Sequence, residues 1–375
     1  MLRHHVVLVP GFFGFSALGR LEYFRGVRPV LEEWFRSHGH VVTLHQVPTL
    51  PSASLRQRAA RVLDTLAVVA NEDDGPIHIV GHSTGGLDAR LAIAPTASLP
   101  SEHKFTAHER LRTLITIATP HYGTPLAAVV GGAMGKPLLG LIAAVAAAGL
   151  RRGEVPLTMA LKLGRIWTRL DDYVGLRNTI MDQLYEDVLD DFSSVTRLQL
   201  IDMARDVAVD QSLIFQLTAA GCDLLNAGTG DPDGVRYGCV VTRAPRPSLR
   251  GVLSHGTNLY AQYMHLLFGA VYSLIARTSS EYSAEPTEAQ LQALRAAFGE
   301  SLEPTDNDGV VPSFSQIWGD VVHAASADHL DVVGHFTPSQ GMPGRLDIFA
   351  SASEFHEPQF VSLWDDVARY VSGSM

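Results

Sequence analysis

The stretch Ile77-His78-Ile79-Val80-Gly81-His82-Ser83-Thr84-Gly85 decides the fold of this chain. Its apolar start predicts a short buried strand, and the segment from Leu87 to Ala94, stopped by Pro95, has a helical pattern. A serine on the sharp turn between a strand and a helix needs small residues two positions before and after it, and both are glycine here. The stretch therefore predicts a nucleophile elbow, in which the Ser83 Oγ projects from the sheet and the next backbone N–H groups face an oxyanion.

A second glycine-rich turn follows an earlier predicted strand. The run His5–Val9 is followed by Pro10-Gly11-Phe12-Phe13-Gly14-Phe15. An acyl-transfer hydrolase takes one oxyanion donor from such a turn, so we expect the backbone N–H groups of Phe12 and Thr84 to form an oxyanion hole. The glycines could instead merely shape a loop; their spacing does not match the G-x-G-x-x-G of a dinucleotide site. We assign Phe13, Phe15 and His82 to substrate binding, although the phenylalanines could equally be ordinary packing residues.

The acid and base of such a site should follow the serine in the order carboxylate, then histidine. Asp308 lies in the turn Thr305–Pro312, and His329 lies in the polar loop Ala327–Asp331. A serine hydroxyl is a poor nucleophile until an imidazole takes its proton, and a carboxylate must orient that imidazole. Spacing alone leaves competitors open, namely His323, His335 and His356 for the base and Asp306, Asp320 and Asp331 for the acid.

The chain is organised as a core, an insertion and a second part of the core. Alternating strand-like and helix-like runs predict a mainly parallel sheet with helices on both faces. We place the first core segment at residues 1–125, a helical cap or lid at 126–234 and the second core segment at 235–375. The expected strands are Val6–Val9, Val41–His45, Ile77–Val80, Leu114–Ala118 and Arg236–Thr242; the expected helices are Pro29–Ser37, Ser54–Ala70, Asn258–Ile275 and Thr287–Phe298.

The insertion contains an almost wholly apolar run, Pro137–Leu150, flanked by basic residues. It is shorter than the roughly 20 apolar residues that a membrane span requires. A buried helix, an interfacial helix and a lid are the alternatives. We favour the lid because the run follows the turn His121–Pro125, which should end near the catalytic face. Such a lid would cover an acyl pocket and could meet a lipid–water interface when open.

Composition narrows the class of protein. The chain has 375 residues, 46% hydrophobic and 18% charged, which suits a large globular enzyme. A net charge of −10 without Lys/Arg clusters argues against binding nucleic acid or anionic membranes. Cys222 and Cys239 are too few for a disulfide framework, and we expect two thiols. Because the first strand starts almost at residue 1, without room for a signal peptide, we expect a cytoplasmic location.

Several ordered motifs resemble those of the α/β-hydrolase superfamily and, within it, the bacterial triacylglycerol lipases. The segment Val9–Gly14 resembles the oxyanion loop of these lipases, with proline in place of the usual histidine. The further similar segments are the lipase box and its helix (Gly81–Arg90), the strand and turn before the lid (Ile117–Pro125), the segment that closes the lid region (Leu217–Ala227), the acid turn (Asn307–Val311) and the histidine loop (Asp328–Asp331). The resemblance implies an α/β-hydrolase fold and favours Asp308 and His329 over their competitors.

Many lipases of this kind hold a structural calcium ion near the histidine loop, and Asp331 occupies the place of one ligand. His335 stands where a further ligand is usually an amide, and an imidazole suits calcium poorly. We therefore expect no metal and no cofactor, and take Asp331 as a solvated or loop-bonding carboxylate.

Together these observations predict a serine esterase or lipase acting on a lipid or another apolar ester through Ser83, His329 and Asp308. A polyester depolymerase or an acyltransferase on the same scaffold is the alternative within enzymes. A catalytically silent binding protein of the same fold is the alternative from another class.

Overall fold

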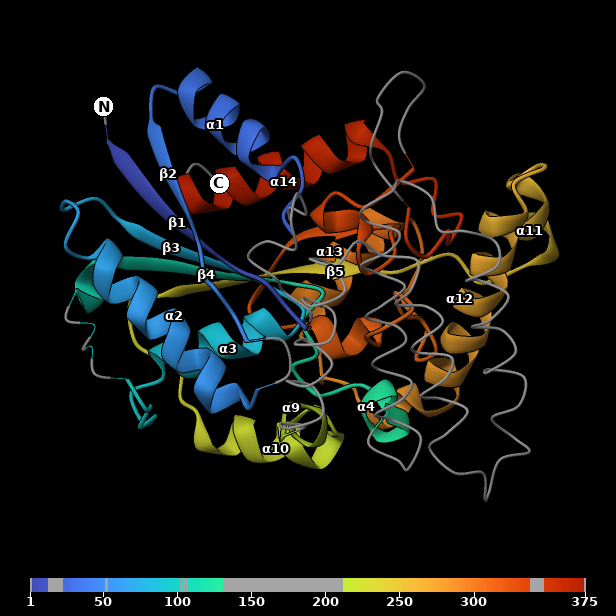
Figure 1. The fold of residues 1–375 in the computed structure, drawn as a ribbon, viewed down its shortest axis with the longest axis horizontal. Helices are drawn as coiled ribbons and strands as arrows, with labels where there is room; N and C mark the ends of the chain where they lie inside the picture. The colour runs from blue at the N-terminus through green and yellow to red at the C-terminus, as the bar shows by residue number, and fades with distance from the viewer. Residues whose placement is uncertain are drawn as a thin grey trace, which may run out of the picture.

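The computed structural model describes residues 2–12, 23–50, 53–101, 103, 105, 107–130, 212–337 and 347–373. These residues form a six-stranded parallel sheet of order β2-β1-β3-β4-β5-β6 (Figure 1). The strands are β1 (Arg3–Val9), β2 (Val41–Gln46), β3 (Ile77–His82), β4 (Leu111–Ile117), β5 (Arg236–Thr242) and β6 (Asp320–Ala325). The predicted run Pro137–Leu150, and with it the lid, lies outside the described residues.

Helices cover both faces of the sheet (Figure 1). Helices α1 (Val27–Ser37) and α14 (Glu357–Ser372) pack on one face, and α2 (Leu55–Val69) and α3 (Thr84–Ile93) on the other. The remaining described helices are α4 (Pro125–Val130), α9 (Ser212–Gln216), α10 (Ala219–Gly228), α11 (Leu249–Ser254), α12 (Leu259–Thr278) and α13 (Glu288–Phe298), with 3-10 turns η1 (His108–Arg110), η3 (Ser279–Glu281), η4 (Ser313–Gln316) and η5 (Asp331–Val333).

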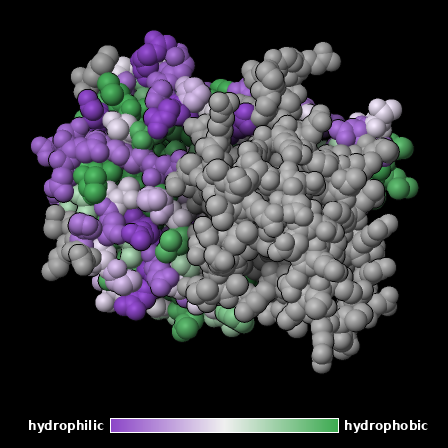
Figure 2. Space-filling model, viewed as in Figure 1, coloured by the Kyte–Doolittle hydropathy of each residue, from purple (hydrophilic) through white to green (hydrophobic). Residues whose placement is uncertain are grey.

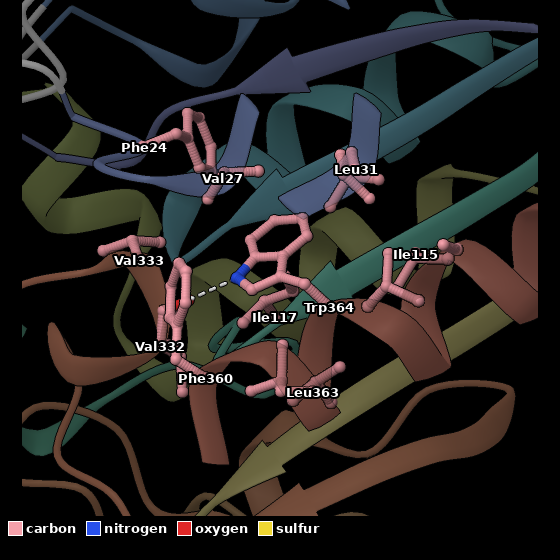
Figure 3. Packing of buried hydrophobic residues seen from close by; sticks show 14 of the residues in the cluster. Phe24, Val27, Leu31, Ile115, Ile117, Val332, Val333, Phe360, Leu363 and Trp364 are labelled. Atoms are coloured by element: carbon pink, nitrogen blue, oxygen red, sulfur yellow. Dashed lines mark hydrogen bonds between the residues drawn. The ribbon is translucent and has the colours of Figure 1, made fainter. Parts of the chain in front are cut away.

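Two apolar cores follow from the alternation of side chains along the strands. In β1, Val6 and Leu8 face the α1/α14 side, whereas Val7 and Val9 face the α2/α3 side. Figure 3 shows Trp364 of α14 at the centre of the first core, where its indole N–H donates to the Val332 carbonyl oxygen at 3.0 Å. Full burial of a large apolar side chain contributes about 1.5–3 kcal/mol, so Trp364 anchors the segment that follows β6 firmly to α14.

The strand order creates a reversal point between β1 and β3. The chain leaves β1 toward β2 on one side and then crosses to β3 on the other side. In open parallel sheets, the loops at the carboxyl ends of the two strands beside such a reversal diverge and leave a crevice where ligands bind. Here these loops begin at Pro10 and at Ser83, so the topology directs the glycine-rich turn and the elbow to the same place.

The structure agrees closely with the expected elements of the core. Within residues 235–373, the structure also contains strand β6 and helices α11 and α14, which were not expected. No helix in the described parts of the chain combines the length and apolar character needed to cross a bilayer. On the face drawn in Figure 2, the described surface is mostly hydrophilic, with apolar residues scattered through it.

Candidate active site

Ser83 lies on a strained turn between β3 and α3. Its backbone has φ 55° and ψ −131°, a conformation that L-residues rarely adopt. The glycines at either side explain how the turn closes: a Cβ on Gly81 would lie 2.6 Å from the Gly85 carbonyl oxygen, and one on Gly85 would lie 2.2 Å from the Val9 carbonyl oxygen. The turn therefore has the geometry of a nucleophile elbow.

His329 and Asp308 meet Ser83 although they come from distant parts of the chain. The His329 Nε2 lies 2.9 Å from the Ser83 Oγ, and its Nδ1 lies 2.8 Å from the Asp308 Oδ2. Because the carboxylate can only accept, the proton of a neutral His329 belongs on Nδ1, and Nε2 is left to accept from the serine hydroxyl. All three residues are nearly inaccessible to solvent.

A network of donors fixes the Asp308 carboxylate. Its Oδ1 accepts from the backbone N–H groups of Val310 (2.9 Å) and Val311 (2.7 Å). Its Oδ2 accepts from the Thr242 hydroxyl (2.8 Å) and the Gln316 amide (3.3 Å) besides His329. These donors hold the Asp308 carboxylate in position beside the His329 ring, where a carboxylate can orient an imidazole. The sequence analysis did not name Thr242 as a site residue. Thr242 is the last residue of β5, and a polar residue at the carboxyl end of a predicted strand is the signal that could have identified it.

The glycine-rich turn lies directly against the serine. A Cβ on Gly11 would be 2.6 Å from the Ser83 Cβ, so only glycine fits there. Thr84 is the first residue of α3, and the first N–H groups of a helix lack intrahelical partners and carry partial positive charge. Phe12 and Thr84 thus stay the predicted oxyanion donors.

A buried arginine that the sequence did not indicate supports this turn. Arg58 of α2 forms an ion pair with Asp88 at 2.7 Å, and both side chains are fully buried. Its guanidinium also donates to the carbonyl oxygens of Pro10 (3.0 Å) and Gly11 (3.2 Å). With their carbonyls held toward Arg58, the peptide groups of this turn have a fixed orientation, which an oxyanion hole requires.

The side chain of His82, predicted to bind substrate, is enclosed by the protein in this structure. The side chain is 0% exposed, and both ring nitrogens are engaged by the protein. The Gly11 N–H donates to the Tyr23 hydroxyl (2.9 Å), which lies 2.7 Å from the His82 Nδ1, and the His82 Nε2 lies 2.9 Å from the His329 carbonyl oxygen. Burial holds the pKa of His82 well below 6.5, so the ring is neutral, with Nε2–H donating and Nδ1 accepting. His82 therefore joins the glycine-rich turn to the histidine loop.

The two other residues assigned to substrate binding, Phe13 and Phe15, lie outside the described residues. The ring of Phe12 packs against an apolar cluster of α2, α3, α4, α9 and α10. The competitors for acid and base have other partners: His323 with Asp366, His335 with the Tyr23 carbonyl, His356 at the start of α14, Asp306 with Arg243 and Arg246, and Asp320 with Tyr370.

Asp331 was expected to be a solvated or loop-bonding carboxylate, and the structure shows the second: it is buried, and its Oδ2 accepts from the Asp328 N–H at 2.9 Å. It forms a cluster with Asp328 and Asp347 in which one oxygen of each lies within 4.8 Å of the others. Burial raises the pKa of all three, to about 8 for Asp328, and for Asp328 and Asp331 repulsion between the carboxylates adds to the effect. The Asp331 Oδ1 is buried without a hydrogen-bond partner among the described residues. Three carboxylates with an unsatisfied oxygen atom are ligands that fit calcium. His335, at the place of a further ligand, contacts the Tyr23 carbonyl oxygen and not this cluster.

The cysteines take no part in this site. Cys222 and Cys239 are free thiols, as expected, and both are buried. Burial raises the pKa of each to about 12, so neither is a reactive thiolate near neutral pH.

Comparisons with known proteins find similarity to esterases and lipases. A family model described as "Putative serine esterase (DUF676)" matches residues 54–150, which include the elbow. A triacylglycerol lipase of Vibrio cholerae serotype O1 is 28% identical over 165 residues, covering 44% of this chain and 46% of that protein. The match therefore spans less than half the length of this curated relative.

Two solved structures share the fold. A metagenomic carboxyl esterase, MGS0156, superposes with a TM-score of 0.51 at 18% identity, covering 99% of this chain and 76% of the esterase. Lipase 1 from Pelosinus fermentans gives a TM-score of 0.51 at 18% identity, covering 99% of each chain. These likenesses confirm the predicted α/β-hydrolase fold, and the chain resembles bacterial lipases and esterases in sequence and in fold.

Proposed function

We propose that this α/β-hydrolase-fold chain is a serine hydrolase that cleaves carboxylic esters with a substantial apolar acyl group. The observation that carries the proposal is the placement of one imidazole between two partners. His329 reaches the Ser83 Oγ at 2.9 Å with Nε2 and the Asp308 carboxylate at 2.8 Å with Nδ1. This is the arrangement that turns a serine hydroxyl into a nucleophile.

In the first half of the reaction, the Ser83 Oγ attacks the ester carbonyl carbon while its proton passes to the His329 Nε2. The carbonyl oxygen becomes an oxyanion, held by the N–H groups of Phe12 and Thr84. Collapse of this intermediate breaks the bond to the leaving alcohol, and His329 returns its proton to that alcohol. The product is an acyl group esterified to Ser83.

In the second half, water attacks the acyl carbon and His329 takes the water proton. The second tetrahedral intermediate releases the carboxylic acid, and the Ser83 Oγ regains its proton from His329. Asp308 stays ionised throughout and stabilises the imidazolium that forms in each half. None of these steps requires a cofactor.

A calcium ion, if bound by Asp328, Asp331 and Asp347, would supply positive charge beside the histidine loop. Asp328 precedes His329 directly, and the carboxylates of Asp328 and Asp331 already accept backbone N–H groups of this loop. The chain's own residues thereby hold His329 in place, and neutralising their mutual repulsion would stabilise that arrangement.

Two observations favour apolar esters as substrates. The name of the Vibrio relative, a triacylglycerol lipase, favours lipid substrates. Exposed leucines on α11, Leu249 and Leu253, are 81% and 74% exposed. Large exposed apolar side chains of this kind suit contact with a lipid–water interface.

Replacing Ser83 by alanine tests the nucleophile. We expect S83A to fold normally and to lose p-nitrophenyl ester hydrolysis by about 10⁴-fold or more. Labelling by a fluorophosphonate should disappear at the same time. A matched control is Ser273→Ala, which removes an exposed serine on α12. Wild-type turnover by S83A would show that the nucleophile is another residue.

An ester chain-length series, run beside polyester and alcohol-acceptor assays, separates hydrolysis of lipids from the two alternatives on this scaffold. A polyester depolymerase would release soluble acids from the polymer, and an acyltransferase would form a new ester in preference to free acid. A catalytically silent binding protein would fail all of these assays and would not react with the fluorophosphonate.

A further inference from the structure

Two histidines and two carboxylates gather at a place on the sheet that the proposed reaction does not use. His5 lies on β1, His45 on β2, and Glu72 and Asp73 in the turn after α2. The strand register pairs His5 with Thr43 and Val7 with His45, so both imidazoles project from the same face. The His5 side chain is 0% exposed, whereas those of His45 and Glu72 are 14% and 40% exposed.

The ring nitrogens of the two histidines face each other. The His5 Nδ1 lies 3.1 Å from the His45 Nε2. The Glu72 carboxylate lies 3.8 Å from the His5 Nδ1 and 3.6 Å from the His45 Nδ1. On the other side of the His5 ring, Nε2 lies 2.8 Å from the Asp73 Oδ1.

The Asp73 contact fixes the tautomer of His5. Because a carboxylate only accepts, Nε2 of a neutral His5 carries the proton, and the Nδ1 lone pair points at His45. A neutral His45 that donates from Nε2 would then direct its own Nδ1 lone pair toward the Glu72 carboxylate. The His45 Nδ1 lone pair and the Glu72 carboxylate would then be two acceptors facing each other without a proton between them. A cation shared by His5, His45 and Glu72 removes this repulsion.

We propose that the His5 Nδ1, the His45 Nε2 and a Glu72 carboxylate oxygen bind a zinc ion, with a water molecule completing the coordination. Zinc–ligand bonds of about 2.0–2.1 Å in a tetrahedral site place ligand atoms about 3.3 Å apart. The His5 Nδ1 lies 3.1 Å from the His45 Nε2 and 3.8 Å from the Glu72 carboxylate, so these two separations need only small adjustments. One ligand atom from each of the three residues lies within 4.8 Å of the others. Asp73 has the position of the carboxylate that commonly supports a zinc-bound histidine from behind. Its second oxygen contacts the Arg3 side chain at 3.4 Å, which holds Asp73 in place.

The ion has a structural role in this proposal. It joins the edge strand β2 to β1 and to the turn before β3. His5 pairs with Ile77 at the start of β3, whereas Ser83 follows the other end of that strand, roughly 20 Å away at about 3.3 Å per residue. Zinc at this cluster should therefore change the stability of the fold more than the chemistry at Ser83.

The test uses the full chain, freed of metals by a chelator, dialysed and kept in excess calcium so that hard-oxygen sites do not compete. Zinc chloride is added, and bound zinc is measured by equilibrium dialysis with elemental analysis. Thermal unfolding and the visible absorption of the cobalt-substituted protein provide independent readouts. The variants are H45A, E72Q and D73N, with H103A as a control that removes an exposed histidine outside the cluster.

We expect wild type and H103A to bind one zinc ion more than H45A and E72Q, to gain a few degrees in Tm with zinc, and to show tetrahedral cobalt bands. D73N should retain the site with about 10- to 100-fold weaker zinc affinity. Circular dichroism verifies that each variant is folded; E72Q changes a half-exposed side chain and keeps its size. Equal zinc content in wild type and E72Q, or a Tm that does not respond to zinc, would overturn the proposal. The contact between His5 and His45 would then be a hydrogen bond without a metal ion.

Discussion

Replacing Tyr23 by phenylalanine removes one oxygen atom from the hydrogen-bonded link between the glycine-rich turn at Gly11 and the histidine loop. The Tyr23 hydroxyl accepts from the Gly11 N–H at 2.9 Å and lies 2.7 Å from the His82 Nδ1. The His82 Nε2 is committed to the His329 carbonyl oxygen at 2.9 Å, so a neutral His82 has no other way to satisfy Nδ1. Y23F therefore leaves two buried polar groups without partners.

The cost follows from those two groups. A buried donor or acceptor left unsatisfied costs about 1–3 kcal/mol, so Y23F should lower the free energy of unfolding by about 2–6 kcal/mol. Activity should fall as well. Loss of a whole oxyanion donor costs about 10²–10³ in turnover, and a turn that is only loosened should lose about tenfold in kcat.

Urea unfolding and p-nitrophenyl ester kinetics measure the two effects. The matched control is Tyr263→Phe, because the Tyr263 hydroxyl is buried without a hydrogen-bond partner among the described residues. Y263F should be neutral or slightly stabilising. If Y23F and Y263F unfold at the same urea concentration with equal kcat, the link through His82 carries neither stability nor activity, and this reasoning is refuted.

Three further predictions concern stability. Burial lowers the pKa of His78 from 6.5 to about 3, so as the pH falls the unfolded chain binds a proton at His78 before the folded chain does. Between about pH 6.5 and 4.5, the free energy of unfolding should therefore fall more for wild type than for H78Q. Equal decreases, measured by urea unfolding at each pH, would contradict this. Calcium should raise the Tm of wild type but not of D347N, as measured by calorimetry with and without a chelator; an equal response would place any calcium elsewhere. Trp364→Phe should cost about 1–3 kcal/mol in urea unfolding, because it leaves the buried Val332 carbonyl oxygen without its indole donor; an unchanged midpoint would argue against that hydrogen bond.

Much of the site could be predicted because it depends on local rules. The Gly81–Gly85 turn must place Ser83 at the end of β3, whatever the rest of the chain does, since larger side chains would collide with the backbone. Asp308 and His329 were favoured by motif resemblance, while spacing alone left several competitors. The structure separates them by contact, since His329 reaches both partners and His323 faces Asp366.

The supporting residues were not predicted. Tyr23, Arg58, Thr242 and Gln316 act through partners far away in sequence, such as the Gln316 amide and the Thr242 carbonyl oxygen at 3.2 Å. No periodicity or motif marks such pairs, and only Thr242, at the carboxyl end of a predicted strand, carried a sequence signal. The contacts of His82 with Tyr23 and with the His329 carbonyl oxygen were not predicted for the same reason. The apolar spacing of α14, by contrast, is regular and could have been found.

The sequence by itself determined the elbow and the parallel sheet, because strand patterning and glycine sterics are properties of short segments. Only the tertiary structure decided which carboxylate and imidazole meet Ser83, and that Asp331 and His82 are buried. Those outcomes depend on packing between β3, β5, β6 and the loops that follow them. Hydrogen bonds and desolvation act over a few ångströms in space, and the chain brings such partners together only when the sheet has formed.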